Sequence, residues 1–249
     1  MLTLPPDIDP GNLPAHIAVI MDGNGRWARS RGLRRSQGHS KGADRVNPIV
    51  RACKDIGIPY ITLYAFSSEN WKRSAIERNF LWRLLVHFVR KELPEMLENG
   101  VRFNVIGDIA ALPAFASTEL AKAMKATSHG NRVTLTLALN YGSRHEILRA
   151  MKKWHADVLA GKATVETLTD KVFSSYLDTS GMPDPDLLIR TAGELRLSNF
   201  LLWQCSYTEI FVTDQYWPDF DENSLLDAIR AYQKRIRRHG GVPEQEETP

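Results

Sequence analysis

Short apolar runs that read as strands alternate with longer helical segments along most of this chain. We predict strands over 16–21, 60–66, 101–106, 133–139 and 187–190, with a last pair around 200–204 and 210–213. The predicted helices cover 41–56, 76–98, 113–127, 144–159 and 222–238. This alternation is typical of βαβ units, whose strands pair in parallel and whose helices cover the sheet. The sequence therefore predicts an α/β fold: a single domain with a central, mainly parallel, six-stranded sheet flanked by helices.

Length and composition suit a soluble globular protein. The chain has 249 residues, of which 43% are hydrophobic and 24% charged. We divide it into an irregular lead-in over 1–15, one main domain over 16–239 and a disordered tail over 240–249. No apolar run approaches the length of a membrane span, and residues 1–15 lack the plan of a signal peptide. We therefore expect a cytoplasmic protein.

The ends of the predicted strands are polar and contain glycine. These strand-end segments are 22–26, 67–73, 107–108, 140–142 and 190–194. The carboxyl ends of parallel strands lie at one edge of a sheet, where open α/β folds bind their ligands. The strand ends are thus expected to converge on one cleft. The first of them, Asp22-Gly23-Asn24-Gly25-Arg26, places an acid, flexible backbone and an arginine together, which suits a metal diphosphate.

Positive charge is concentrated in one segment. Between Arg26 and Arg45 there are seven Lys and Arg residues against Asp44 alone, a local excess of seven minus one, or +6. Arginine binds phosphate oxygens in a fork geometry, so a polyanionic ligand fits this segment; a solvated basic face is the alternative. The net charge of the whole chain is only +3, which does not favour a nucleic-acid partner.

The charged residues near the strand ends narrow the chemistry. They are Asp22, Arg26, Arg35, His39, Arg73, Arg190, Arg196 and Glu209. Several arginines beside isolated acids suit a site that holds more than one phosphate group, with Mg²⁺ bridging phosphate oxygens. Neither a Walker-type phosphate loop nor a dinucleotide-binding glycine motif is present. Transfer chemistry on diphosphate-bearing substrates fits best.

Several long motifs, in order, resemble the cis-prenyltransferase family, and most closely its bacterial undecaprenyl diphosphate synthases. The resemblance runs from about His16 to Arg238. It is carried by HIAVIMDGNGRWA, GHSKGADRV, TLYAFSSENWKR, VRFNVIGD, LNYGSRHEI, DLLIRTAGELRLSNFLLWQCSYTEIFVTD and WPDF. The family members are homodimers with an apolar tunnel between the sheet and long helices. Here the apolar face of the helix over 76–98 is the candidate wall of that tunnel.

The resemblance implies a reaction and its requirements. Isopentenyl diphosphate is condensed onto an allylic diphosphate such as farnesyl diphosphate, in repeated head-to-tail steps that leave cis double bonds. Mg²⁺ is the implied cofactor. The implied product is undecaprenyl diphosphate, a precursor of the cell-wall lipid carrier. Transient association with a membrane for product release is compatible with this reaction.

The resemblance also assigns roles to residues. Asp22 and Asn70 are the implied catalytic residues, and Asp22 and Glu209 the implied metal ligands. Residues implied to bind the allylic diphosphate are Gly23, Asn24, Gly25, Arg26, Trp27, Arg35 and His39. Those implied for isopentenyl diphosphate are Ser67, Trp71, Arg73, Arg190, Arg196 and Ser198.

The chain departs from the family pattern at a few positions, and other functions stay open. Ala192 stands where Gly or Ser is usual, Ser143 replaces a Gly, Ser74 replaces a frequent Pro and Arg78 an apolar residue. These changes bear on loop flexibility and substrate preference. One alternative function is a non-catalytic accessory subunit of a prenyltransferase. Another is a Mg²⁺-dependent phosphohydrolase, which would need a second acid, Asp108, close to Asp22.

Overall fold

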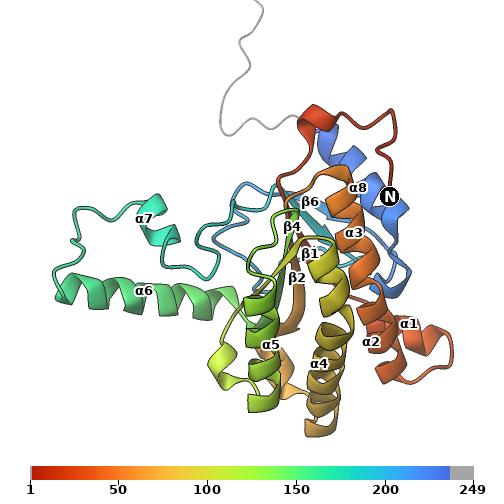
Figure 1. Ribbon diagram of the computed structural model, residues 1–249, viewed down its shortest axis with the longest axis horizontal. Coiled ribbons are helices and arrows are strands. Elements are labelled where there is room, and N and C mark those ends of the chain that lie inside the picture. The colour runs from red at the N-terminus through yellow and green to blue at the C-terminus, as the bar shows by residue number, and fades with distance from the viewer. Residues whose placement is uncertain (1, 236–249) are drawn as a thin grey trace, which may run out of the picture.

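The computed structural model of this chain describes residues 2–235. Its centre is one sheet of six strands in the order β3-β4-β2-β1-β5-β6, and every pairing is parallel (Figure 1). The strands are β1 His16–Ile20, β2 Tyr60–Ser67, β3 Val101–Ile106, β4 Val133–Tyr141, β5 Leu187–Arg190 and β6 Glu209–Val212. The predicted α/β class and the six-stranded sheet are confirmed. The predicted disordered tail over 240–249 lies outside the described residues.

Helices connect the strands, as parallel pairing requires. The α-helices are α1 Asn24–Ser30, α2 Arg35–Asp44, α3 Val46–Ile56, α4 Ala75–Glu98, α5 Ala114–Ala126, α6 Ser143–Leu159, α7 Asp170–Ser174 and α8 Glu222–Gln233. Short 3-10 turns are η1 Pro10–Asn12, η2 Ser68–Lys72, η3 Ile109–Ala111 and η4 Trp217–Asp219. No helix among the described residues is long and apolar enough to cross a membrane.

The first predicted helix, over 41–56, is two helices in the structure. α2 ends at Asp44 and α3 begins at Val46, so Pro48 falls in the first turn of α3. The backbone N–H groups of a first turn have no partner within the helix, so a proline costs nothing there. α1 was not predicted, because seven residues with two arginines carry little apolar periodicity.

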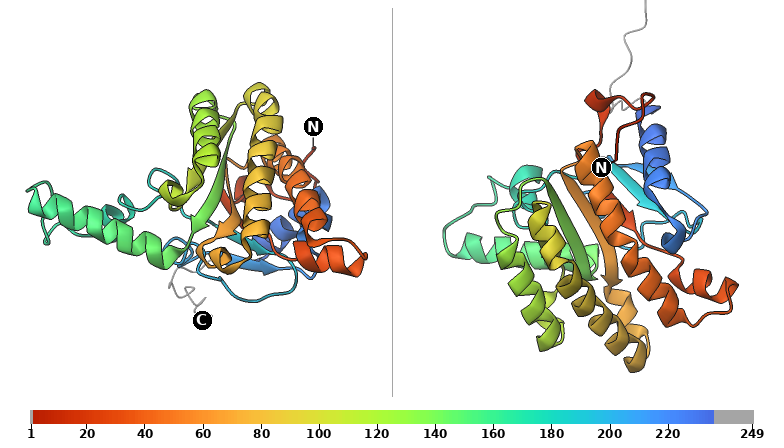
Figure 2. Two further views of the ribbon diagram at one scale, coloured as in Figure 1. Left: turned by 90° about the horizontal axis from the view of Figure 1, so that it is seen from below. Right: turned by 45° about the vertical axis from the view of Figure 1, so that its right-hand side comes forward.

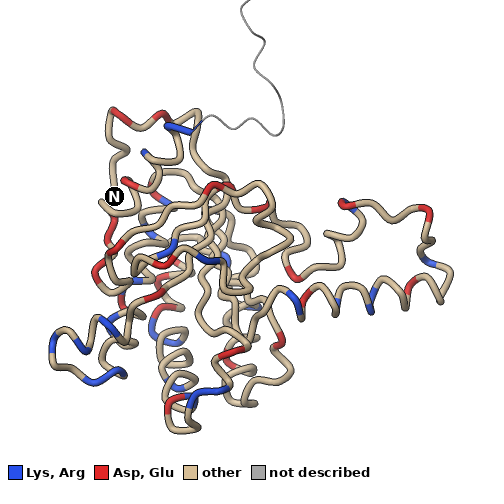
Figure 3. Tube along the Cα trace, turned by 180° about the vertical axis from the view of Figure 1, so that it is seen from behind, with Lys and Arg blue, Asp and Glu red and all other residues tan. Residues whose placement is uncertain are grey.

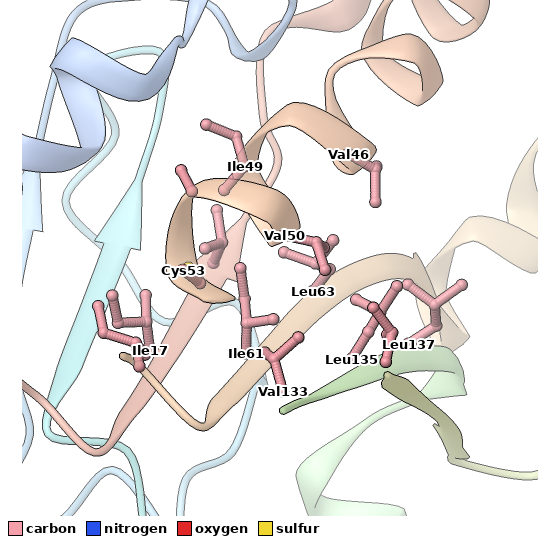
Figure 4. Close-up of a cluster of buried hydrophobic side chains, with 14 of the residues drawn as sticks. Ile17, Val46, Ile49, Val50, Cys53, Ile61, Leu63, Val133, Leu135 and Leu137 are labelled. Carbon is pink, nitrogen blue, oxygen red and sulfur yellow. The ribbon is translucent and has the colours of Figure 1, made fainter. Parts of the chain in front are cut away.

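The larger core lies on one face of the sheet, under α3, α4, α5 and α8. Ile17, Val19, Ile61 and Leu63 of the central strands pack there against buried side chains such as Ile49 of α3. Figure 4 shows this cluster from β1 and β2 to β4 and α3. α3 has a strongly one-sided apolar face, and this face is buried.

The second face of the sheet has a smaller core, and it explains a wrong strand prediction. Residues 200–204 form turns rather than a strand. Phe200 and Leu201 are fully buried there against Ala18 and Leu188 of the sheet. An apolar run indicates that a segment is buried, but it does not distinguish a buried strand from a buried turn. The strand prediction over 200–204 was wrong for this reason.

α6 and α7 project from the body as an arm (Figures 1 and 2). The base of the arm is fixed by a buried carboxyl group, Glu146. It accepts hydrogen bonds from the Tyr141 hydroxyl at 2.5 Å and from Gln204 Nε2 at 3.1 Å, and burial raises its pKa. The arm is thereby joined to the end of β4 and to the turns over 200–204.

Candidate active site

A cavity of about 640 Å³ opens beyond the carboxyl ends of the central strands. Its polar lining comprises Asp22, Asn24, Arg35, His39, Ser67, Glu69, Asn70, Arg73, Ser198 and Asn199. Its apolar lining includes Ala43, Val46, Leu81, Leu84, Leu85, Phe88, Leu137 and Leu139. The cavity thus has a polar part at the strand ends and an apolar part between the sheet and α4. The segments 22–26 and 67–73 meet here, whereas 107–108, 140–142 and 190–194 do not line the cavity. Arg190 is connected to the cavity through its contacts with Asp22 and Ser198.

The turn after β1 depends on glycine. Gly23 has φ +96°, and a Cβ there would lie 2.6 Å from Tyr216 Cδ1 and 2.9 Å from Ala192 Cβ. Both the conformation and the lack of space exclude a side chain. The Gly23 N–H donates to Asp22 Oδ1 at 2.6 Å, and α1 begins at the next residue. Asp22 is held rigidly where the cavity meets the start of this helix.

Arg190, the last residue of β5, organises the polar part of the cavity. Its side chain is only 4% exposed, and Nη2 lies 3.1 Å from Asp22 Oδ2. Its Nη1 donates to Ser198 Oγ at 2.8 Å and to the Arg196 carbonyl oxygen. A single buried guanidinium therefore joins the end of β1 to the loop over 191–198.

Glu77 in the first turn of α4 gathers three cationic or imidazole groups. Its Oε1 lies 2.9 Å from Arg73 Nη1, 3.3 Å from Arg35 Nε and 3.8 Å from His39 Nε2. Burial lowers the pKa of His39 to about 4, helped by the charges of Arg73 and Arg35. His39 is therefore neutral at neutral pH in the ligand-free site.

Four buried polar atoms in and around the cavity have no hydrogen-bond partner among the described residues. They are Asn24 Oδ1, His39 Nε2, Ser68 Oγ and Arg190 Nε. Buried polar groups in proteins are nearly always paired, so such a cluster indicates that a polar ligand completes the site. The hydroxyl group and the guanidinium N–H among them are donors that suit a ligand rich in oxygen atoms, whereas Asn24 Oδ1 is an acceptor and does not.

The segment after β2 is tied to its surroundings by side chains. Asn70 Oδ1 accepts from the Ser67 N–H at 3.2 Å, and Trp71 Nε1 donates to Asn140 Oδ1 at 2.5 Å. Arg78 Nη1 donates to the carbonyl oxygens of Trp71, at 2.9 Å, and Arg73. Asn140 has φ +46°, a conformation that asparagine tolerates better than most residues.

Three of the unusual residues, Ser74, Arg78 and Ser143, have local roles in this structure. Ser74 caps α4 by accepting a hydrogen bond from the Glu77 N–H at 3.3 Å. Arg78 holds the preceding turn through the two carbonyl contacts above. Ser143 is fully buried and accepts from the Leu202 N–H at 3.0 Å. Ala192 adopts the left-handed conformation, φ +73°, that glycine would occupy without strain.

Several predicted site residues lie outside the cavity lining. Trp27 is buried in α1 and donates through Nε1 to Asp219 Oδ1 at 2.7 Å. Arg26 and Arg196 both pair with Glu194, at 3.0 and 2.5 Å. Trp71 is half exposed and packs its ring against Phe66 and Trp82. Arg26 borders the polar part of the cavity through Asp22, whose Oδ1 lies 3.4 Å from Arg26 Nη2, whereas the Arg196 side chain is 58% exposed and contacts Glu194. Trp27 supports α1 from within.

Glu209, the second predicted metal ligand, does not lie near Asp22. It begins β6 and lies beside Leu187 at the amino end of β5, whereas Asp22 follows the carboxyl ends of the strands. A strand rises about 3.3 Å per residue, so Glu209 and Asp22 are at opposite edges of the sheet. Glu209 instead pairs with Arg235 at 3.0 Å. Within one chain the two carboxylates do not share a metal ion.

The residues that sequence reasoning missed are mostly carboxylates that neutralise the cations. Glu77 and Glu194 each contact two arginines, and Glu69 accepts from Asn199 Nδ2 at 3.0 Å. The four-residue spacing of Arg73 and Glu77 at a helix start was a usable signal. Arg26, a partner of Glu194, and Asn199, the partner of Glu69, lie far away in the sequence and left no local signal, whereas Arg196 is only two residues from Glu194.

Asp22 could bind Mg²⁺ as a single carboxylate ligand, with substrate phosphates as the other ligands. Among the described residues no group of three or more His, Cys, Asp or Glu side chains could hold a metal ion. Mg²⁺ is commonly bound through one or two carboxylates plus substrate phosphates, so a single fixed carboxylate beside arginines is adequate. Asp108, the second acid that a phosphohydrolase would need, is exposed and does not line the cavity.

Known proteins resemble this chain over nearly its whole length. The sequence model of the undecaprenyl diphosphate synthase family matches residues 20–240. The isoprenyl transferase of Clostridium tetani is 50% identical, over 94% of this chain and 92% of the relative. The isoprenyl transferase of Agrobacterium fabrum is 49% identical, over 94% of this chain and 95% of the relative.

Solved structures share the fold. Lavandulyl diphosphate synthase from Lavandula x intermedia, solved with dimethylallyl diphosphate, has a TM-score of 0.88 and 36% identity, covering 90% of this chain and 97% of that one. A structure described as a probable undecaprenyl diphosphate synthase from Campylobacter jejuni has a TM-score of 0.76 and 33% identity, covering 92% and 99%. The chain therefore belongs to the undecaprenyl diphosphate synthase family of cis-prenyltransferases, and it is a prenyl-transferring enzyme.

Proposed function

We propose that the cavity binds an allylic diphosphate and isopentenyl diphosphate side by side and joins them. The observation that carries this proposal is one cavity with a cationic, partly unpartnered polar end and an apolar end. The diphosphate groups occupy the polar end. The allylic chain, and later the growing product, lies along Leu81, Leu85 and Phe88 of α4.

The two diphosphates are assigned to different walls. The allylic diphosphate contacts the 23–26 turn together with Arg35 and His39, where the backbone N–H groups at the start of α1 face an anion. Isopentenyl diphosphate contacts Arg190, Arg196 and Ser198, and Ser67, Asn70, Trp71 and Arg73 position it between the walls. Asp22 lies between them, because it already contacts both Arg190 and Arg26.

The chemistry requires charge stabilisation above all. The allylic C1–O bond breaks, C1 bonds to C4 of isopentenyl diphosphate, and C2 of the latter loses a proton to restore a double bond. Asp22 would hold Mg²⁺, which when bound would neutralise charge on the leaving diphosphate. Arg26 and Arg35 contribute fixed positive charge near the developing anion. We assign the proton to an oxygen of the leaving diphosphate.

We further propose that the enzyme works as a cytoplasmic homodimer and makes undecaprenyl diphosphate for the cell-wall lipid carrier. The matching family model and the Campylobacter jejuni structure, both described as undecaprenyl diphosphate synthases, support the product. The projecting arm supports the dimer: Leu148, Met151 and Leu159 of α6 are exposed apolar side chains on it. A second copy would cover them.

The direct test is to incubate the purified protein with labelled isopentenyl diphosphate, Mg²⁺ and allylic starters of different length, and to size the products. We expect elongation that stops at the undecaprenyl length and ceases in excess EDTA. Asp22→Ala should lower turnover by about 100-fold or more, on the scale of losing one key transition-state contact. Asp108→Ala, at an exposed strand-end acid, is the matched control and should retain full activity. Hydrolysis of the diphosphate without chain elongation would overturn the proposal.

A further inference from the structure

The two polar walls of the cavity are built differently. One wall belongs to α1 and α2, and Figure 3 shows the group of basic positions at the turn between these helices. The other wall carries Ser198 and belongs to the connection over 191–208, which contains neither helix nor strand. Ser198, Asn199 and Leu201 of this loop have φ of +49°, +61° and +46°. Because such conformations cost free energy, contacts from other segments must hold the loop in place.

Asn199 ties this loop to the start of α6. Its backbone carbonyl oxygen accepts from the Ser143 N–H at 2.8 Å, and its Oδ1 accepts from the Arg144 N–H at 3.0 Å. These two residues begin α6, whose N-cap residue, Gly142, has no side chain to offer. The first N–H groups of a helix have no partner within the helix. Asn199 therefore caps α6 from outside.

The same side chain also reaches the segment after β2. Asn199 Nδ2 donates to Glu69 Oε1 at 3.0 Å. Burial opposes ionisation of Glu69, but hydrogen bonds, chiefly that from Asn199, outweigh it and lower the pKa of this carboxyl group. The bond is therefore charge-assisted. A Cβ at Gly142 would lie 2.7 Å from Asn199 Nδ2 and 2.5 Å from Ser68 Oγ, so three segments of the chain meet closely at this point.

Asparagine has the chemistry for all of these contacts. Its amide supplies an acceptor and a donor at once, and it tolerates the left-handed conformation better than most residues. On one side of it, Ser198 Oγ accepts from Arg190 Nη1 at 2.8 Å. On the other side, Phe200 is fully buried and stacks on Tyr64 with ring centroids 4.4 Å apart. Asn199 thus lies between a cavity residue and a core residue of the same loop.

We propose that Asn199 is a positioning residue for isopentenyl diphosphate. It holds the loop that carries Ser198 against the segment that carries Ser67 and Asn70, and so it fixes the width of the space in which this substrate lies. This rests on the proposed function, which assigns both segments to isopentenyl diphosphate. Ser67, Glu69, Asn70, Ser198 and Asn199 all line the one cavity. If Asn199 served only as a helix cap, its loss would affect stability and both substrates alike.

Two substitutions separate the contacts of this side chain. Asn199→Asp keeps an oxygen for the Arg144 N–H but removes the donor and places two carboxylates face to face. Asn199→Gly removes the side chain without adding charge and keeps the left-handed conformation free of strain. Calorimetric titration with isopentenyl diphosphate alone measures binding without turnover. Both variants should weaken this binding about 10-fold, as expected for loss of one charge-assisted hydrogen bond. Their affinity for farnesyl diphosphate should not change.

Exchanging donor and acceptor provides a rescue. When Asn199→Asp is combined with Glu69→Gln, the glutamine amide can donate to the introduced carboxylate, and the total charge equals that of the wild type. This double variant should recover most of the lost affinity. The matched control is Asn131→Asp, which adds the same charge in an exposed turn before β4 and should bind as the wild type does.

The outcomes separate this inference from the proposed function. Unchanged affinity for isopentenyl diphosphate in both Asn199 variants would overturn it, even if the wild type elongates a starter. Equal loss of affinity for both substrates, with lower stability in urea, would reduce Asn199 to a helix cap and overturn it as well. Failure of the double variant to recover would exclude the bond to Glu69. Selective loss in a protein that binds both substrates without joining them would support this inference and contradict the proposed function.

Discussion

At the scale of single residues, Arg190 shows why position in the fold matters more than charge. It contacts Asp22, Ser198 and the Arg196 carbonyl at once, and burial isolates these contacts from water. Arg196, by comparison, is 58% exposed and pairs with Glu194. Although both arginines are assigned to the same diphosphate, we expect Arg190 to contribute more than Arg196 to binding isopentenyl diphosphate.

Lysine substitutions test this difference. Arg190→Lys should raise the apparent KM for isopentenyl diphosphate about 10-fold or more, because one ammonium group cannot replace a fork that joins several partners. Arg196→Lys should change it less than the Arg190 substitution. Steady-state kinetics with the allylic substrate saturating measures both. Equal effects of the two substitutions would contradict the central role of Arg190.

His39 gives the site a dependence on pH. Its pKa is lowered to about 4 in the ligand-free protein, mainly by burial. A diphosphate bound beside it favours the protonated form, so the pKa rises on binding and a proton is taken up. Binding should therefore strengthen as the pH falls toward 6. Calorimetry in buffers of different ionisation enthalpy measures the number of protons taken up on binding. In the His39→Gln variant this number should be smaller by the share that His39 contributes. An unchanged proton count in the variant would exclude His39.

At the scale of elements, the packing of α1 against α2 relies on a missing side chain. A Cβ at Gly38 would lie 2.0 Å from the Asn24 carbonyl oxygen and 3.1 Å from Ala28 Cβ. The two helices can approach only because this position has no side chain. Their approach places Asn24, Gly25, Arg35 and His39 in one cavity wall.

Gly38→Ala should consequently separate α1 from α2. We expect a loss of about 1–3 kcal/mol in the free energy of unfolding, the usual range for overpacking. Affinity for the allylic diphosphate should fall with it. Denaturant titration and substrate binding provide the two measurements. Ser36→Ala, in the same helix, is the control and should change stability by less than about 0.5 kcal/mol. Unaltered stability of the Gly38 variant would show that the helices can adjust.

At the scale of the whole molecule, a buried histidine at the start of a central strand holds the segment that follows the arm. His16 at the start of β1 is fully buried, with Nδ1 2.7 Å from the Pro183 carbonyl oxygen and Nε2 2.8 Å from Thr62 Oγ1. Burial lowers its pKa to about 4. The segment that returns from α7 to β5 is thereby fixed to β1 and β2.

This histidine predicts acid sensitivity. Between pH 6.5 and 4 the unfolded chain takes up a proton that folded His16 does not, so stability falls as the pH falls through this window and then levels off. The contribution is about 3 kcal/mol. Urea titrations at several pH values measure it, and His16→Gln should show a shallower decline. His39 acts over the same window, so His39→Gln isolates its separate share. A decline of the same slope in the His16 variant would exclude this cause.

Much of the fold followed from local pattern. The ranges of β1, β3 and β5, the long α4 and the parallel sheet agree with the alternation of apolar runs and helical periods, because burial on a sheet imposes that alternation. The strand predicted over 200–204 failed for the same reason: Phe200 and Leu201 are buried without being in a strand. An apolar run indicates that a segment is buried, and it indicates a strand only when other features, such as length and flanking turns, agree.

The sequence by itself determined which chemical groups are available: an acid in a glycine turn, an excess of arginines and motifs typical of one family. The tertiary structure alone decided which of them meet. It joined Arg190 to Asp22 and Glu77 to Arg35, and it placed Glu209 at the opposite edge of the sheet. These outcomes depend on strand order, register and helix approach. Such features arise from packing between residues far apart in the chain, and so they leave no signal in any local stretch of sequence.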